Sequence, residues 1–234
     1  MQRHRKLQRL LFMNKKRIKS LVACFAAVLL ISGCGKDFDA AGYTQAMLDL
    51  NFQGELEGAL KYEEDATEES LMRLYQEAID QFVAMNITSD IEMNEIKTTE
   101  FSELISKIFA TMRYDVGEAR KTDKEEYEVP VKIEPSDVMI RYQQLLTEDS
   151  LKVAQKVKEG GYEGTEEEIQ QQVLNDIINH AYELLDVAYT DMQYGEPESV
   201  ILHIRVDEGE KYSIDEEDMD HLIQKILRLD EIQG

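Results

Sequence analysis

Two segments of this chain alternate between inward apolar positions and outward positions that are mostly polar, which is the pattern of a β-strand with one buried face. They cover residues 127–134 and 200–207. The inward positions are Tyr127, Val129, Val131 and Ile133 in the first segment, and Val200, Leu202, Ile204 and Val206 in the second. Because an isolated two-stranded hairpin is only marginally stable, both segments must pair further and bury their apolar face. The chain is therefore predicted to build an antiparallel sheet with one covered face.

Amphipathic helices are predicted to supply that cover, because apolar residues recur at helical spacing in several stretches. The clearest stretch covers residues 101–112, where the apolar side chains fall at i, i+3, i+4, i+7, i+8 and i+11. Further helices are predicted near residues 41–51, 56–62, 68–85, 142–158, 165–188 and 216–227. Thr165 opens a Thr-Glu-Glu-Glu capping box, which is a strong helix-start signal. Helices and sheet together predict an α+β protein.

Three connections carry specific predictions. Residues 86–98 are polar and interrupted and are predicted to form a loop. A strand near residues 187–194 is predicted to lead through a turn at residues 195–198 into the second alternating segment. Pro130 has no backbone N–H, so its strand is predicted to lie at a sheet edge or to contain a bulge.

Two stretches of the chain resemble each other. TEESLMRLYQEAID at Thr67 and TEEEIQQQVLNDII at Thr165 align without gaps, and each leads on to a helix and a hairpin. This predicts a diverged duplication with quasi-repeats at about 42–137 and 138–234. The predicted fold class is therefore α+β, with amphipathic helices packed on a four-stranded antiparallel sheet built from two helix–hairpin quasi-repeats. We expect the two hairpins to join in one sheet.

The start of the chain has the composition of a signal peptide. Residues 1–33 contain eight Lys and Arg and no Asp or Glu, and an apolar run extends from Leu21 to Ile31. Eleven helical residues span only about 16 Å, which is too short for a permanent membrane helix. A removable signal peptide at residues 1–33 is therefore predicted, and Met13 provides an alternative start within it.

The apolar run ends in Ile31-Ser32-Gly33-Cys34. Small residues at Ser32 and Gly33 let a peptidase approach the backbone, and Cys34 supplies a thiol that a lipid can alkylate. The tetrad resembles the bacterial lipobox Leu-(Ala/Ser)-(Gly/Ala)-Cys, with Ile31 in place of Leu. The chain is thus similar to the uncharacterised lipoproteins of Gram-positive bacteria, whose soluble part is a small α+β domain without an assigned activity. The resemblance implies that Cys34 is diacylated, palmitate being one such acyl group, and becomes the first mature residue, followed by a tether at 34–41 and an extracytoplasmic domain at 42–234.

Charge restricts the partners of the mature chain. Cleavage before Cys34 removes eight of the 26 Lys and Arg and none of the 48 Asp and Glu, which leaves a net charge of −30. Such an acidic protein is not expected to bind nucleic acid, because phosphate contacts need Lys and Arg. It is also repelled by anionic lipids, so membrane attachment at the extracytoplasmic face is expected to depend on the lipid at Cys34. Cys24 is removed with the signal peptide, so no free thiol, disulfide or cysteine metal site is expected.

No catalytic motif is present, and the three mature histidines, His180, His203 and His221, lack metal-ligand spacing. Neither a cofactor nor a metal is predicted, and the acidic residues 215–220 are explained by the dipole of the helix that they begin. The expected function is a non-enzymatic binding or interaction module, with a protein or peptide partner of unknown identity. Two alternatives stay open: an extracellular hydrolase that uses two carboxylates, and an acidic surface that captures a metal ion or a basic peptide.

Overall fold

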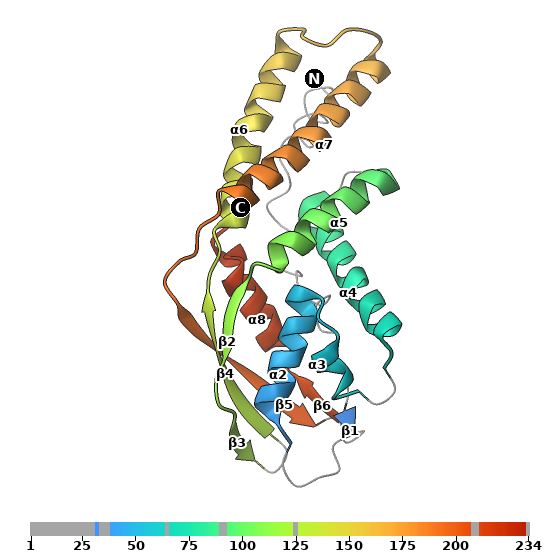
Figure 1. Cartoon of the computed structure of the whole chain (residues 1–234). Coiled ribbons are helices and arrows are strands. Elements are labelled where there is room, and N and C mark those ends of the chain that lie inside the picture. Colours follow the sequence, from blue (N-terminus) through green and yellow to red (C-terminus); the bar gives the residue numbers. More distant parts are fainter. Residues whose placement is uncertain are drawn as a thin grey trace. The chain divides into compact units, whose positions relative to one another are not determined.

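The computed structural model describes residues 31–32, 38–63, 66–88, 93–123, 126–206 and 211–232. Its α-helices and the turns that extend them are α2 (Ala40–Leu48) with a π-helical turn (Asp49–Gln53), α3 (Glu57–Leu60), α4 (Glu68–Val83) with a π-helical turn (Ala84–Thr88), α5 (Glu95–Phe109), α6 (Val138–Lys158), α7 (Glu166–Thr190) and α8 (Glu216–Ile226) with a 3-10 turn (Leu229–Glu231). Its strands are β1 (Ile31–Ser32), β2 (Arg113–Val116), β3 (Arg120–Asp123), β4 (Glu126–Glu134), β5 (Glu198–Val206) and β6 (Lys211–Ile214). The predicted α+β class is confirmed (Figure 1).

These residues form two compact units. The sheet unit contains the described residues up to Pro135 together with residues 194–226. The helical-hairpin unit contains residues 136–193 and the described residues from Leu227 onward. These units do not follow the boundary of the predicted quasi-repeats at residue 137, and the duplication itself stays a prediction.

The two alternating segments pair directly with each other at the centre of one antiparallel sheet. β4 pairs with β5, with Val129 opposite Leu202 and Val131 opposite Val200. The strand order is β1-β6-β5-β4-β2, and β3 also pairs with β4. The two alternating segments therefore join in one sheet, as expected, but β5 forms its hairpin with β6 and not with residues 187–194, and the described sheet has six strands rather than four. The alternation does not predict β1, β3 or β6, because none of these strands is longer than four residues and none shows a clear pattern.

Pro130 lies in an inner strand, so the prediction of an edge position is wrong. Gly117 donates its backbone N–H to the carbonyl of Pro130 at 2.8 Å. In an antiparallel strand the N–H and C=O of one residue point the same way, so the nitrogen of Pro130 also faces this side. The pairing of β2 with β4 ends at Val131 and the pairing of β3 with β4 begins at Glu128, which leaves Pro130 at the gap between them. The missing donor of Pro130 therefore affects only the reciprocal bond to the Gly117 carbonyl, just beyond the end of β2, and the proline is tolerated there.

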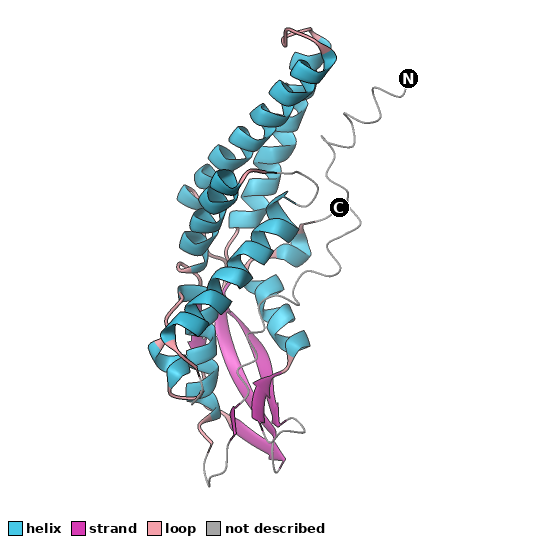
Figure 2. Ribbon diagram, turned by 90° about the vertical axis from the view of Figure 1, so that its right-hand side faces the viewer, coloured by secondary structure: helices cyan, strands magenta, loops and turns pink. Residues whose placement is uncertain are grey.

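Helices α2 and α8 pack against the inward face of the sheet, as the one-sided apolar pattern predicted (Figure 1). Figure 2 shows the strands of this unit from another side. The buried sheet positions include Val129, Val131, Leu202 and Ile204, each fully inaccessible to solvent. A second layer of helices, α4 and α5, adds an aromatic cluster in which Phe109 contacts Phe82 and Phe52 at ring-centroid distances of 4.9 and 5.9 Å. The predicted helix over 101–112 corresponds to α5.

The helical-hairpin unit is built on α6 and α7, whose facing apolar side chains form their own small core. Its buried members are Val153, Tyr162 and Val173. Tyr162 donates a hydrogen bond to Asp176 at 2.8 Å, and Lys156 lies over its ring and pairs with the same carboxylate at 2.9 Å. The predicted capping box is present, since Thr165 and Glu168 each accept the other's backbone N–H.

Two sequence predictions about connections are wrong. The strand expected near residues 187–194 is largely the end of α7, which continues to Thr190. Leu185 and Ala188 are buried at helical spacing and no helix breaker precedes them, so helical packing outweighs the β-propensity of Val187 and Tyr189. The loop expected over residues 86–98 is shorter, because a π-helical turn reaches Thr88 and α5 begins at Glu95. None of the described helices combines the length and apolar character needed to cross a bilayer.

Candidate functional site

The lipidation residue predicted from sequence, Cys34, and the preceding Gly33 lie outside the described residues. The other two residues of the tetrad form the short strand β1, in which Ile31 pairs with Tyr212 and Ser32 with Lys211 of β6. Cleavage before Cys34 would remove β1, so this pairing would belong to the unprocessed chain.

The first described residue after the predicted lipidation site is Phe38, which lies in an aromatic cluster. Its ring stacks on Tyr212 at 3.8 Å with an interplanar angle of 4°, and it contacts Tyr43 and Tyr127, each at 5.6 Å. The next residue, Asp39, caps α2 by accepting the N–H of Gly42 at 2.9 Å. The chain is therefore held firmly against the sheet from Phe38 onward.

The three mature histidines do not converge. His180 lies in α7 and contacts Asp149 at 2.9 Å, His221 is exposed on α8, and His203 lies on the outward face of β5. Across the described residues, no group of three His, Cys, Asp or Glu side chains could hold a metal ion.

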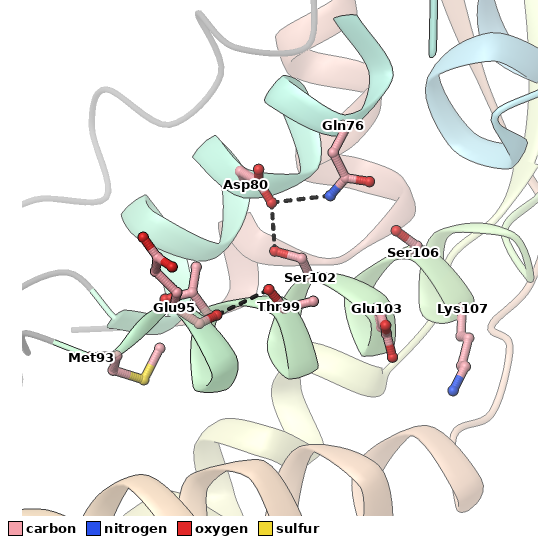
Figure 3. Close-up of a pocket in the computed structure, with 10 residues that line it drawn as sticks. Gln76, Asp80, Met93, Glu95, Thr99, Ser102, Glu103, Ser106 and Lys107 are labelled. Atoms are coloured by element: carbon pink, nitrogen blue, oxygen red, sulfur yellow. Dashed lines mark hydrogen bonds between the residues drawn. The ribbon is translucent and has the colours of Figure 1, made fainter. Parts of the chain in front are cut away.

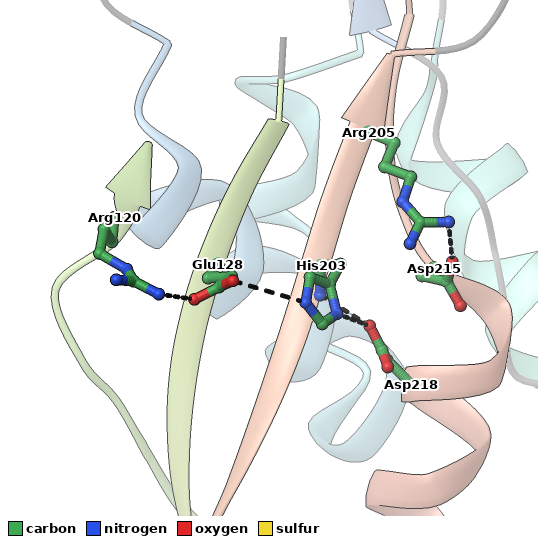
Figure 4. A network of polar contacts seen from close by, with 6 residues as sticks. All are labelled: Arg120, Glu128, His203, Arg205, Asp215 and Asp218. Carbon is green, nitrogen blue, oxygen red and sulfur yellow. Dashed lines mark hydrogen bonds and ion pairs between the residues drawn. The ribbon is translucent and has the colours of Figure 1, made fainter. Parts of the chain in front are cut away.

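His203 is the centre of a polar network that joins β4, β5 and α8 (Figure 4). Asp218 accepts both the backbone N–H of His203, at 2.8 Å, and its Nδ1, at 2.7 Å. The Nε2 atom lies 3.9 Å from Glu128, which pairs with Arg120. The hydrogen bond from Arg120 is the main reason that the pKa of Glu128 lies below its ordinary value.

This network completes an edge of β5 that β6 is too short to cover. β6 pairs with β5 only over residues 204–206. Immediately beyond this pairing, Asp215 donates its backbone N–H to the carbonyl of His203 at 2.8 Å, and the Asp218 carboxylate accepts the N–H of His203. The start of α8 thus substitutes for a strand at this position, and we interpret the network as mainly structural.

Replacing Asp218 with Asn is expected to lower the free energy of unfolding by about 1–2 kcal/mol, because a neutral amide oxygen accepts the two N–H groups of His203 more weakly than the charged carboxylate oxygen does. Denaturant unfolding of the full mature chain measures this. Glu77→Gln, a change of the same kind at an exposed position of α4, serves as the control and should change stability little. Equal effects of the two substitutions would contradict the bridging role of Asp218.

The acidic start of α8 is occupied by internal contacts, in agreement with its explanation as a helix start. Asp215 accepts the backbone N–H of Glu217 at 3.0 Å and pairs with Arg205 at 2.7 Å. Asp220 differs from the others, because partial burial, and then repulsion from Glu216 and Glu217, raises its pKa to about 6. A raised carboxyl pKa means that the folded state disfavours the ionised form.

This raised pKa predicts a stability effect with a definite sign. Ionised Asp220 lowers the stability of the folded state, and this loss is absent below its unfolded pKa of 3.8 and complete above about pH 6. Asp220→Asn is therefore expected to raise the melting temperature at pH 7.5 and to change it little at pH 4. Melting curves between these values measure the difference, with Glu77→Gln on α4 as the control. A gain of the same size at both pH values would contradict the assignment.

A groove between α4 and α5 is the candidate binding site (Figure 3). Its volume is about 770 Å³. Its lining side chains are mostly hydroxyl, amide and carboxylate groups, from Gln76, Asp80, Met93, Glu95, Thr98, Thr99, Ser102, Glu103, Ser106 and Lys107. Asp80 joins the two helices, since its Oδ1 accepts hydrogen bonds from Ser102 at 2.7 Å and Gln76 at 3.1 Å.

Sequence reasoning had missed this groove. Asp80 and Ser102 are 22 residues apart, and only the packing of α4 on α5 brings them together. A weak signal was available, because Thr98, Ser102 and Ser106 recur every four residues and therefore share one face of a helix. The groove combines hydrogen-bond donors and acceptors with three carboxylates and one lysine, so it suits a polar ligand that is neutral or cationic.

Fold and sites together define an α+β protein whose described strands form one antiparallel sheet, with a groove between two helices. It is similar to a Bacillus subtilis subsp. subtilis str. 168 crystal structure named "putative lipoprotein (ycdA)". That similarity has a TM-score of 0.48 and 14% sequence identity, and it covers 81% of this chain and 56% of that chain. The chain thus spans little more than half the length of that protein. No protein-family model and no curated protein matches the chain.

Proposed function

We propose that this protein is a lipid-anchored protein of the bacterial cell envelope, held at the extracytoplasmic face of the cell membrane through Cys34. The observation that carries this proposal is the order of its first 34 residues: a basic segment, an apolar run too short to remain in the bilayer, and the tetrad Ile31-Ser32-Gly33-Cys34. Two acyl chains on one cysteine give stable membrane attachment without help from protein charge. Attachment by the lipid alone is important here, because a mature chain with a net charge of −30 is repelled by anionic lipids.

The folded part acts as a non-enzymatic binding or interaction module, with the groove between α4 and α5 as its contact site. The hydroxyl groups of Thr98 and Ser106 and the exposed carboxylate of Glu103 offer hydrogen bonds to a polar partner. Asp80 accepts hydrogen bonds from Gln76 and Ser102 and so joins the two helices. Because this carboxylate has a structural role, it supports a binding function for the groove rather than a catalytic one. The acidic start of α8 is a weaker candidate for capturing cations, because Asp215 and Asp218 already have partners.

Site-specific cross-linking in cells tests the groove. Because Cys34 is lipidated and Cys24 is removed, Glu103→Cys places one reactive thiol in the groove of the mature protein. A photoactivatable thiol reagent on this residue is expected to give a discrete higher-mass adduct. Glu77→Cys, an exposed position on α4 outside the groove, is the matched control and should give none. Adducts of equal yield at both positions, or none at either, would contradict the groove as the contact site.

A further inference from the structure

The aromatic cluster around Phe38 fixes which end of the sheet unit can lie near a membrane. Only three residues separate Cys34 from Phe38, so their Cα atoms are at most about 14 Å apart, whatever path the chain takes. Phe38 is held by stacking on Tyr212 and by edge contacts with Tyr127 and Tyr43. A lipid on Cys34 therefore brings this part of the fold close to the bilayer.

The contacts of Phe38 identify one end of the sheet. Tyr127 is the second residue of β4, Tyr212 is the second residue of β6, and Lys121 of β3 lies opposite Tyr127. The strand β4, which is nine residues long, then runs away from this point to Glu134. At about 3.3 Å per residue, the two ends of β4 are about 26 Å apart. We call the region of Phe38, Lys121, Thr122, Tyr127 and Tyr212 the Phe38 end.

We infer that the Phe38 end is the membrane-facing surface of the sheet unit, with the lipid bilayer as its partner. This inference rests on the proposed lipidation of Cys34. The opposite end of the sheet, where β4 finishes and β5 begins at Glu198, then points away from the bilayer. The attachment of Phe38 gives this orientation a physical cause, because three buried tyrosines, each less than a tenth exposed, hold a residue that lies only four positions after Cys34.

Energy transfer to the membrane surface tests the orientation. Two exposed hydroxyl residues serve as matched label sites: Thr122 at the Phe38 end, and Ser199, which pairs with Lys132. Lys132 lies five residues along β4 from Tyr127, a distance of about 17 Å. Thr122→Cys and Ser199→Cys are expressed as full-length precursors, purified from membranes, labelled with a donor dye and reconstituted in phosphatidylethanolamine–phosphatidylglycerol vesicles that carry acceptor-labelled headgroups.

We expect several-fold more energy transfer from position 122 than from position 199, with both proteins floating with the vesicles. Flotation with equal transfer, or with more from position 199, would overturn the orientation and leave the lipid anchor intact. Failure of both proteins to float would overturn lipid anchoring, and the orientation with it. Phe38→Ala should reduce the difference between the two positions without changing flotation, and an unchanged difference would show that Phe38 does not hold the domain.

Discussion

Replacing Cys34 with Ala is expected to abolish the lipid-dependent membrane form of the protein. The wild-type chain should partition into the detergent phase and begin with a diacylated Cys34. Each buried methylene of the acyl chains contributes about 0.8 kcal/mol to membrane binding, and no described helix is suited to cross the membrane in their place. The variant should be released, or should accumulate at the larger size of an unprocessed chain. Cell fractionation, carbonate washing and the mass of the N-terminal peptide measure both results.

Cys24→Ala provides the matched control, because it is the same substitution ten residues earlier, inside the segment predicted to be removed. This control should be processed and localised as the wild type. A Cys34→Ala protein that stays in carbonate-washed membranes at unchanged size would show that the tetrad is not a lipidation site.

Replacing Phe109 with Ala should destabilise the sheet unit by about 3–5 kcal/mol, which is the usual cost of removing a large aromatic side chain from a core. Phe109 is 1% exposed and lies between Phe82 of α4 and Phe52 of the turn after α2. Its loss leaves a cavity where three segments meet, and the flanking rings cannot fill it without leaving their own contacts.

Ile96→Ala on the same helix is the control for this substitution. Ile96 is 71% exposed, so its truncation should change stability by less than about 0.5 kcal/mol. Chemical unfolding followed by tyrosine fluorescence and circular dichroism measures both variants. Similar losses for Phe109→Ala and Ile96→Ala would show that α5 does not pack on the aromatic cluster as described.

Regular patterns in the sequence predicted most of the fold. The alternation at 127–134 and 200–207 located the two central strands, and the apolar face of residues 101–112 located α5. Both patterns are regular because the side chains on one buried face recur every second residue in a strand and every three or four residues in a helix. The strand predicted near residues 187–194 is wrong because burial of a continuous face decides the element here too. Val187 and Tyr189 favour strands individually, but their neighbours Leu185 and Ala188 continue the buried face of a long helix.

The candidate sites were harder to predict, because they depend on contacts between distant segments. His203 was correctly placed on the outward face of its strand, yet its two bonds to Asp218 follow from the way α8 folds back beside β5. The groove depends in the same way on the packing of α4 on α5. The role of Cys34 stays a prediction, and it depends on neighbouring residues in the sequence rather than on the fold.

The inner proline of the sheet has a consequence for how the strands find their alignment. A slip of β4 by two residues would keep every apolar side chain on the buried face, so hydrophobic burial alone does not exclude it. Such a slip would place Pro130 opposite Asp115 or Arg120, where the partner strand would lose a backbone donor. In the observed alignment Pro130 lies beside Gly117, where a side-chain carbon would lie only 3.0 Å from the proline ring. Pro130 thus fits beside a glycine just beyond the end of β2 and is disfavoured further inside the ladder, so it favours one alignment among several that bury the same surface.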